Sequence, residues 1–396
     1  MFSFTESLKF QAVLFLLIIL TSSCWTRKIE PIDLLFNRSI DIPTNRIVDL
    51  SHRSNAQFYQ WENTGNFIAV YTTVDLSIHV YDFDALTEHK VIDLSNLPNK
   101  AEVRAFLFLD EKTILVSTQL SSQYYIVNEK GEIIKPFNIR PKHIPDIEGI
   151  AYGNFNDGAH ALPMLFIDNK YIVLYQRHFA PYPYLQEFCK FIVLEYTYED
   201  SISLRVHDVI EKDRIKNLST QWLGEMTPNS CAIENKMMVS AFGNPNIQSL
   251  HIGSGVSNIF QSPESNFIKE QILLDSSRMD DAAYITNNEL ANNGYTTIRY
   301  DPYHKLIYRI VSLATEDTIN YIHPFFNTND KKPFSIMIYD LEMKLLSEIK
   351  FPAHRYNSKN IIPTPEGLLL DVTNEGNPRF TSSKLQYDLF KIKAIE

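Results

Sequence analysis

The segment that decides the fold spans residues 295–311 and reads YTTIRYDPYHKLIYRIV. Two runs rich in Ile, Val and Tyr flank the pair Asp301-Pro302. Because β-branched and aromatic residues favour strands and an Asp-Pro pair favours a turn, the segment predicts an antiparallel hairpin. Neighbouring residues on a strand point to opposite faces, so Tyr308 and Arg309 are expected to be structural rather than a catalytic pair.

The same pattern continues on both sides of this hairpin, from about residue 58 onward. Short runs of Val, Ile, Tyr and Phe are broken by Asn, Asp, Gly and Pro, and no long stretch keeps a helical apolar period. The runs fall into six units, at residues 67–94, 105–137, 164–209, 230–261, 296–350 and 361–392. Two of these units contain the same GNP sequence after their second strand, at residues 243–245 and 376–378.

These units predict an all-β fold, a six-bladed β-propeller of four-stranded antiparallel sheets. The first and last units lack strands, which we expect them to supply to each other or to receive from residues 47–50. Closing the ring in this way removes an exposed sheet edge.

The N-terminus carries an apolar segment, FQAVLFLLIIL at residues 10–20. As a helix it would reach about 16 Å, which is short of the roughly 30 Å hydrocarbon core of a bilayer. The segment therefore fits a signal peptide, and the TSSC sequence that ends at Cys24 resembles the lipobox of bacterial lipoproteins, although Leu20 lies one place earlier than usual. The alternative is ordinary cleavage near Ser23, which gives an exported protein without a lipid.

The expected organisation is a signal peptide at residues 1–23, a lipidated Cys24 with a tether at 24–45, and one β-propeller domain at 46–396. The sequences YDPY at residues 300–303 and YR at 308–309, together with this layout, resemble a family of unknown function found in lipoproteins of Bacteroidota. Those proteins look like TolB-like six-bladed propellers. The resemblance implies a location in the cell envelope, lipid-anchored to a bacterial membrane and facing the periplasm or the cell surface, and it assigns no catalytic residue.

Composition narrows the classes of partner. The net charge is −10 and no run of Lys and Arg is present, so nucleic-acid binding is not expected. No cofactor or metal is expected, because no HExxH, GxSxG or phosphate-binding loop occurs and no Cys or His has metal spacing. Cys189 and Cys231 could pair in an oxidising compartment, or remain as buried thiols. Arg278 with Asp280-Asp281 is interpreted as a solvated loop.

Three long loops are the best candidates for a binding site. They cover residues 177–188 (RHFAPYPYLQEF), 314–333 and 374–383, and each connects the second and third strands of its unit. Loops of this length are often functional, and tyrosines can stack on a sugar or hold a peptide. The candidate ligand-binding residues are Arg177, His178, Tyr182, Tyr184, Tyr321, His323 and Arg379. The alternative is that these aromatic residues pack the loops against the propeller.

Two functions remain open on this sequence. The first is a binding module at the cell envelope that presents one propeller face to a protein, a peptide or a glycan. The second is a propeller enzyme, a hydrolase or lyase acting on an envelope or extracellular glycan or peptide. The fold hosts both classes, so the chemistry of the site has to decide between them.

Overall fold

The computed structural model describes residues 32–44, 56–61, 65–98, 103–118, 123–138, 165–167, 171–177, 191–197, 202–204, 229–240, 244–252, 254–268, 278, 281–316, 331–374 and 376–394. Within these residues the chain forms six four-stranded antiparallel sheets and one α-helix. The prediction of an all-β propeller built from four-stranded antiparallel sheets is confirmed.

Five of the sheets use consecutive strands, and we name each after its first strand. The β2 sheet has β2 (Gln57–Trp61), β3 (Gly65–Thr72), β4 (Ser77–Asp82) and β5 (Thr87–Asp93). The β6 sheet has β6 (Val103–Phe108), β7 (Thr113–Thr118), β8 (Gln123–Asn128) and β9 (Ile133–Asn138). The β10 sheet has β10 (Leu165–Ile167), β11 (Tyr171–Arg177), β12 (Phe191–Thr197) and β13 (Ile202–Leu204).

The β14 sheet has β14 (Asn229–Ile233), β15 (Lys236–Ser240), β16 (Ile247–His251) and β17 (Ser257–Phe260). The β18 sheet has β18 (Gly294–Asp301), β19 (Leu306–Ser312), β20 (Phe334–Tyr339) and β21 (Leu345–Phe351). The closing sheet joins the two ends of the chain, with β22 (Asn357–Thr364), β23 (Gly367–Asp371), β24 (Lys384–Ala394) and β1 (Ile32–Pro43).

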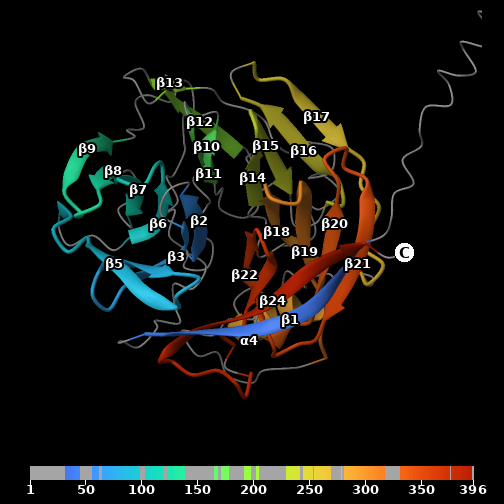
Figure 1. The fold of residues 1–396 in the computed structure, drawn as a ribbon. Helices are drawn as coiled ribbons and strands as arrows, with labels where there is room; N and C mark the ends of the chain where they lie inside the picture. Colours follow the sequence, from blue (N-terminus) through green and yellow to red (C-terminus); the bar gives the residue numbers. More distant parts are fainter. Residues whose placement is uncertain are drawn as a thin grey trace, which may run out of the picture.

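The sheets are arranged around a common centre, which their first strands face (Figure 1). Neighbouring first strands contact each other from β10 to β14, β18, β22 and β2. Because every sheet is antiparallel and begins with its inner strand, all inner strands run in the same direction. We call the face at their N-terminal ends the mouth face and the opposite face the base face. Loops from second to third strands leave from the mouth face.

The core lies between the sheets rather than inside any one of them. One buried apolar cluster joins the β2 and β6 sheets, and others join the β14 sheet to the β18 sheet, the β18 sheet to the closing sheet, and the closing sheet to the β2 sheet. Strands that are covered on both sides become almost continuously apolar, as in LIYRIVS of β19. This explains why such doubly covered strands occur in the sequence as uninterrupted apolar runs.

The hairpin that opened the sequence analysis is present as β18 and β19. Asp301 Oδ1 accepts hydrogen bonds from the backbone N–H groups of Tyr303 and His304, at 2.9 and 3.0 Å, which fixes the turn. Tyr308 and Arg309 are both fully buried and lie on opposite faces of the sheet. Tyr308 packs toward the closing sheet, and Arg309 reaches the β14 sheet. Their predicted structural roles agree with this placement.

The closing strand differs from the sequence-based prediction. The sequence predicts a tether over residues 24–45, but Ile32–Pro43 forms β1 and pairs with β24 from Ile32 opposite Ala394 to Pro43 opposite Lys384. The segment at residues 47–50, proposed earlier for this role, lies outside the described residues. Strand β1 escaped detection because a register shift between Phe36 and Arg38 interrupts its alternation of buried and exposed residues.

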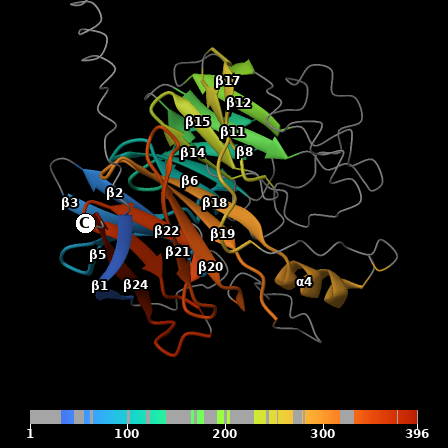
Figure 2. The ribbon, with the colours of Figure 1, turned by 90° about the vertical axis from the view of Figure 1, so that its right-hand side faces the viewer.

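A helix that the sequence did not suggest precedes β18. Helix α4 (Ala282–Ala291) begins after Asp281, whose Oδ1 accepts a hydrogen bond from the backbone N–H of Tyr284 at 2.9 Å. Figure 2 shows α4 and the C-terminus on opposite sides of the ring, which places α4 on the mouth side. Among the described residues, no helix has the length and apolar character needed to span a membrane.

Candidate functional site

The inner strands are irregular where they meet the mouth face. In β22 the pairing passes from Asn357–Asp371 directly to Ile361–Leu370, so three residues of β22 have no partner in the ladder. In β18 a smaller irregularity separates Tyr295 from Ile298. A bulge pushes residues out of the sheet, and on an inner strand the free edge faces the centre of the ring. The strands β18 and β22 are neighbours, and each irregularity lies in the N-terminal half of its strand.

The bulge of β22 is held by a buried carboxylate, Asp371, at the end of β23. Asp371 Oδ2 accepts hydrogen bonds from the amide groups of Asn360 and Asn357, at 3.0 and 3.4 Å. Its Oδ1 accepts the backbone N–H and the hydroxyl of Thr373. These hydrogen bonds from neutral donors fix the bulge of β22.

One polar side chain in these bulges has no such partner, because Thr296 Oγ1 is buried and has no hydrogen-bond partner among the described residues. Lys359 is 8 % exposed as a whole residue, but its Nζ is not one of the buried polar atoms that lack a partner. Sequence reasoning singled out neither residue, because it began the sixth unit at Ile361, after Lys359, and treated Thr296 as an ordinary strand residue of the fifth unit. The available signal was the polar run NSKN at residues 357–360, directly before an apolar inner strand.

Arg379, the predicted site residue that the structure describes in full, belongs to a network around Asp388 of β24. Arg379 Nη1 lies 2.8 Å from Asp388 Oδ1, and the hydroxyl groups of Ser39 and Tyr356 donate to the same carboxylate at 2.7 and 2.9 Å. The hydrogen bond to Asp388 raises the pKa of Arg379. Arg355 approaches Asp388 Oδ2 at 3.9 Å. The network connects β1, β24 and the mouth loop of the closing sheet, so Arg379 has a structural role there.

The two GNP loops are both fixed by neighbouring groups at the mouth. The buried Arg309 donates to the carbonyl oxygens of Asn244 and Pro245 and to Ser240 Oγ, and its guanidinium lies 3.7 Å from the ring centroid of Tyr295. Burial lowers the pKa of Arg309 to about 10.

In the second loop the amide of Asn377 donates to the carbonyl oxygen of Arg355 at 2.7 Å. The amide of Asn374, two residues before the repeated sequence, donates to the carbonyl oxygen of Tyr356 at 3.3 Å. The repeated sequence therefore occurs where polar groups hold a mouth loop against its surroundings.

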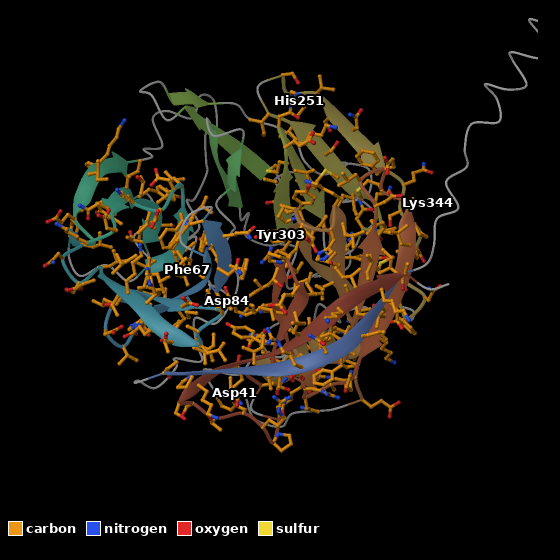
Figure 3. All side chains as sticks on the ribbon, viewed as in Figure 1. Asp41, Phe67, Asp84, His251, Tyr303 and Lys344 are labelled. Carbon is orange, nitrogen blue, oxygen red and sulfur yellow. The ribbon has the colours of Figure 1, made fainter. Side chains whose placement is uncertain are left out.

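The base side of the centre is crossed by an aromatic contact. Tyr303, in the β18–β19 turn, lies near the middle of the ring in Figure 3. Its ring packs edge-on against Phe58 of β2, with centroids 6.1 Å apart, although the closing sheet lies between their two sheets. Burial, together with the charge of Asp301, raises the pKa of Tyr303 to about 12. This contact joins the β18–β19 turn to β2 on the base side of the centre.

The other predicted site residues belong in sequence to β11 or to the segments that follow β11 and β19. Arg177 is the last residue of β11, so its backbone lies at the mouth end of that strand. His178, Tyr182, Tyr184, Tyr321 and His323, together with Cys24, lie outside the described residues. The loops that contain the histidines and tyrosines connect β11 to β12 and β19 to β20, second strand to third strand, as the sequence analysis expected.

The remaining candidates have structural explanations or lie outside the described part. Cys231 is a buried free thiol whose pKa burial raises to about 12, and Cys189 lies outside the described residues. Asp281 pairs with Arg278 at 2.7 Å on the surface and caps α4. The backbone hydrogen bond from Tyr284, with the Arg278 contact, lowers the pKa of Asp281. No group of three metal-binding side chains occurs in the described part of the chain.

Comparison with known proteins identifies the fold. No protein-family model and no curated protein sequence matches the chain. A solved structure from Bacteroides vulgatus, a member of the DUF4221 family, superposes with a TM-score of 0.69 at 20 % identity, over 93 % of this chain and 100 % of that one. A protein from Bacteroides fragilis gives 0.47 at 8 % identity, covering 94 % and 97 % of the two chains. The chain therefore shares its propeller fold with a DUF4221 protein of Bacteroides.

Proposed function

We propose that the chain is a non-catalytic binding module, a closed six-bladed propeller of the TolB-like type that presents its mouth face to a ligand at the cell envelope. The observation that supports a ligand at this face is the buried hydroxyl group of Thr296, which has no hydrogen-bond partner among the described residues and lies in a bulge at the mouth end of β18. A buried polar group without a partner destabilises the folded state, so its retention favours a role in binding. The six four-stranded sheets support the blade number.

We propose further that Cys24 carries a lipid and that the chain is a lipoprotein. Strand β1 starts opposite Ala394, at the base face, so the N-terminal segment leaves from the side opposite the mouth. Between Cys24 and Ile32 an extended chain reaches at most about 28 Å. A protein held in this way would sit with its base toward the membrane and its mouth toward the surroundings.

The ligand class that fits the mouth loops is a glycan or a peptide. Tyr182, Tyr184 and Tyr321 would supply stacking surfaces, and Arg177, His178 and His323 would supply polar contacts. Arg379 would contribute a further polar contact to the ligand, since its side chain remains 41 % exposed beside Asp388. Among the described residues, no contact supports the alternative of a hydrolase or lyase at the same face.

The test is a binding panel with variants on the two faces. The protein, held through a biotin at its C-terminus on the base face, is offered envelope glycans and peptides. We expect at least one saturable ligand, and we expect the double variant Tyr182→Ala with Tyr321→Ala to fold normally and bind it at least tenfold more weakly. A ligand bound equally well by this variant would contradict the assignment to the mouth loops. Conversion of the ligand to product would favour the enzyme.

A further inference from the structure

Two arginines of the closing sheet share one buried carboxylate. Arg379 Nη1 lies 2.8 Å from Asp388 Oδ1, and Arg355 Nη2 lies 3.9 Å from Asp388 Oδ2. The side chain of Asp388 is 1 % exposed, whereas those of Arg379 and Arg355 are 41 % and 53 % exposed. One negative charge therefore faces two positive charges, and both guanidinium groups are accessible from the solvent.

The contacts given for these two arginines leave donors available for a further acceptor. A guanidinium group carries five N–H donors. Arg379 uses Nη1 for its hydrogen bond to Asp388, and Arg355 is at ion-pair distance from the same carboxylate and 5.2 Å from the ring centroid of Tyr356. The fully buried Arg309 is different, because its Nε, Nη1 and Nη2 atoms all donate to oxygen atoms of the protein. Among the described residues, Arg355 and Arg379 therefore have more donors than acceptors.

A single buried side chain holds the backbones of both arginines. Asn377 is 7 % exposed, and its Nδ2 donates to the carbonyl oxygen of Arg355 at 2.7 Å. Its Oδ1 accepts the backbone N–H of Arg379 at 2.9 Å. Asn374 adds a second connection, since its Nδ2 donates to the carbonyl oxygen of Tyr356 at 3.3 Å. The fold therefore positions the two arginines together before any ligand binds, which lowers the entropy lost on binding.

Connectivity places both arginines at the mouth face. Arg379 lies in the loop from β23 to β24, which connects a second strand to a third. Arg355 lies in the connection from β21 to β22, and a fourth strand runs toward the mouth, where the next inner strand begins. The proposed function assigns the tyrosine-containing loops to the same face.

The local charge of the described residues favours an anion. Two guanidinium groups and one carboxylate leave one positive charge. The adjacent ion pair, Asp41 with Lys384 at 3.1 Å, is neutral as a pair. Glu375, in the same loop as Arg379, lies outside the described residues. The net charge of −10 belongs to the whole chain, and salt at physiological strength screens exposed charges beyond about 8 Å.

We propose that Arg355 and Arg379 form a binding site for the carboxylate group of an acidic sugar at the mouth face. This inference rests on the proposed function and narrows its ligand to a uronate-containing glycan. The planar donor pattern of a guanidinium group matches a carboxylate, and the aromatic rings that the proposed function places at this face can stack on sugar rings. Acidic peptides and inorganic phosphate offer related oxygen anions, which the experiment separates from the glycan.

The experiment titrates the full chain by calorimetry with a galacturonate trimer and with the methyl ester of that trimer, which has the same sugar rings without the charge. We expect saturable binding of the acid and binding of the ester that is weaker by about tenfold or more. Arg355→Gln should weaken binding of the acid by about fivefold or more, on the scale of one hydrogen bond to a charged group. Its thermal melting should change little, because the ion pair that it removes is long and exposed.

The matched control makes the same substitution on the opposite face of the closing sheet. Arg38 pairs with Glu366, in the β22–β23 turn at the base, at 3.1 Å, and its side chain is 54 % exposed. Arg38→Gln therefore removes one exposed, paired guanidinium group from the base side. It should leave the binding of the galacturonate trimer unchanged.

Four results would overturn the site: no saturable binding of the trimer, equal binding of acid and ester, equal binding of the acid by Arg355→Gln and the unmodified protein, or binding confined to acidic peptides or inorganic phosphate. If Arg355→Gln fails to fold, modification of the arginines of the unmodified protein with phenylglyoxal decides. The trimer should protect Arg355 and Arg379 and leave Arg38 reactive, and equal modification with and without the trimer overturns the site.

The same measurements separate this inference from the proposed function. A neutral glycan from the panel that binds through the mouth tyrosines, with equal strength in Arg355→Gln, would refute the inference and leave the proposed function standing. Loss of acid binding in Arg355→Gln, but not in Tyr182→Ala with Tyr321→Ala, would support the arginine site and contradict the role proposed for the tyrosines.

Discussion

The network around Asp388 makes a quantitative prediction about ring closure. In Asp388→Ala the buried Tyr356 hydroxyl loses its acceptor, which costs about 1–3 kcal/mol. The hydrogen bond from Arg379 contributes about 1 kcal/mol once its 41 % side-chain exposure is taken into account. Ser39 is exposed, so water can replace the carboxylate at little cost. We expect Asp388→Ala to lower the free energy of unfolding by about 3 kcal/mol.

The matched control lies on the same pair of strands. Asp41 of β1 pairs with Lys384 of β24 at 3.1 Å, but both side chains are about two-fifths exposed. An exposed ion pair contributes less than about 1 kcal/mol, so Asp41→Ala should change the free energy of unfolding by no more than that. A third variant, Tyr356→Phe, removes the buried hydroxyl and leaves the Arg379 contact, and it should cost about 1 kcal/mol.

The assay is urea denaturation followed by both circular dichroism and tryptophan fluorescence, with coincident curves as the requirement for a two-state analysis. The three variants should rank with Asp388→Ala as the least stable. If Asp388→Ala and Asp41→Ala differ by less than 1 kcal/mol from each other, burial of the network does not stabilise the closing sheet, and the reasoning is wrong.

Three further outcomes can be checked with the same protein. Arg309→Met leaves a serine hydroxyl and two loop carbonyls without their donor, so it should lower the free energy of unfolding by about 2–4 kcal/mol in urea. Gly367→Ala places a Cβ 2.1 Å from the carbonyl oxygen of Phe390 at a φ of +141°, and a loss below about 1 kcal/mol would contradict that geometry. Burial raises the pKa of Cys231 to about 12, so in a Cys189→Ser background the thiol should react with a thiol reagent at pH 8 only after unfolding.

Lipid anchoring has its own test. Cys24→Ser should release the protein from membranes into the soluble fraction, because acyl chains supply the attachment in the proposed lipoprotein. Retention of the variant in washed membranes would contradict this. The proposed mouth-outward orientation adds a second readout, since protease applied from outside should then cut the mouth loops before the base turns.

The strands could be predicted because the strand-forming residues and the turn-forming residues between them indicate the same hairpins. The β18–β19 hairpin is the clearest case, with Asp301 closing the turn as its residue type suggests. Strand β1 could not be predicted, since exposed Leu35 and Phe36 and the register shift after Phe36 conceal its pattern. Helix α4 contains two asparagines in ten residues and has no polar face, so it lacks the periodicity that identifies a helix.

The polar mouth was the hardest part to predict from sequence. Lysine and asparagine next to a strand normally indicate a solvated turn, and only the pairing register shows that Lys359 and Asn360 belong to an inner strand. The three candidate loops were selected for their length and aromatic content, and connectivity alone assigns a loop between second and third strands to the mouth face. Arg379 was selected for its position in such a loop, but the partner that holds it, Asp388, is remote in the sequence and could not be anticipated.

The closing sheet cannot form until the C-terminal strand β24 has been synthesised. Ser39 and its partner Asp388 are 349 residues apart in the chain. At about 5–20 residues per second, a ribosome adds that length in roughly 20 to 70 s. During this interval β1 exists as a free strand with Leu35 and Phe36 exposed, and it competes for any other unpaired edge. A chain that stops before β24 keeps that edge unpaired, so incomplete products should be the first to aggregate or to be degraded.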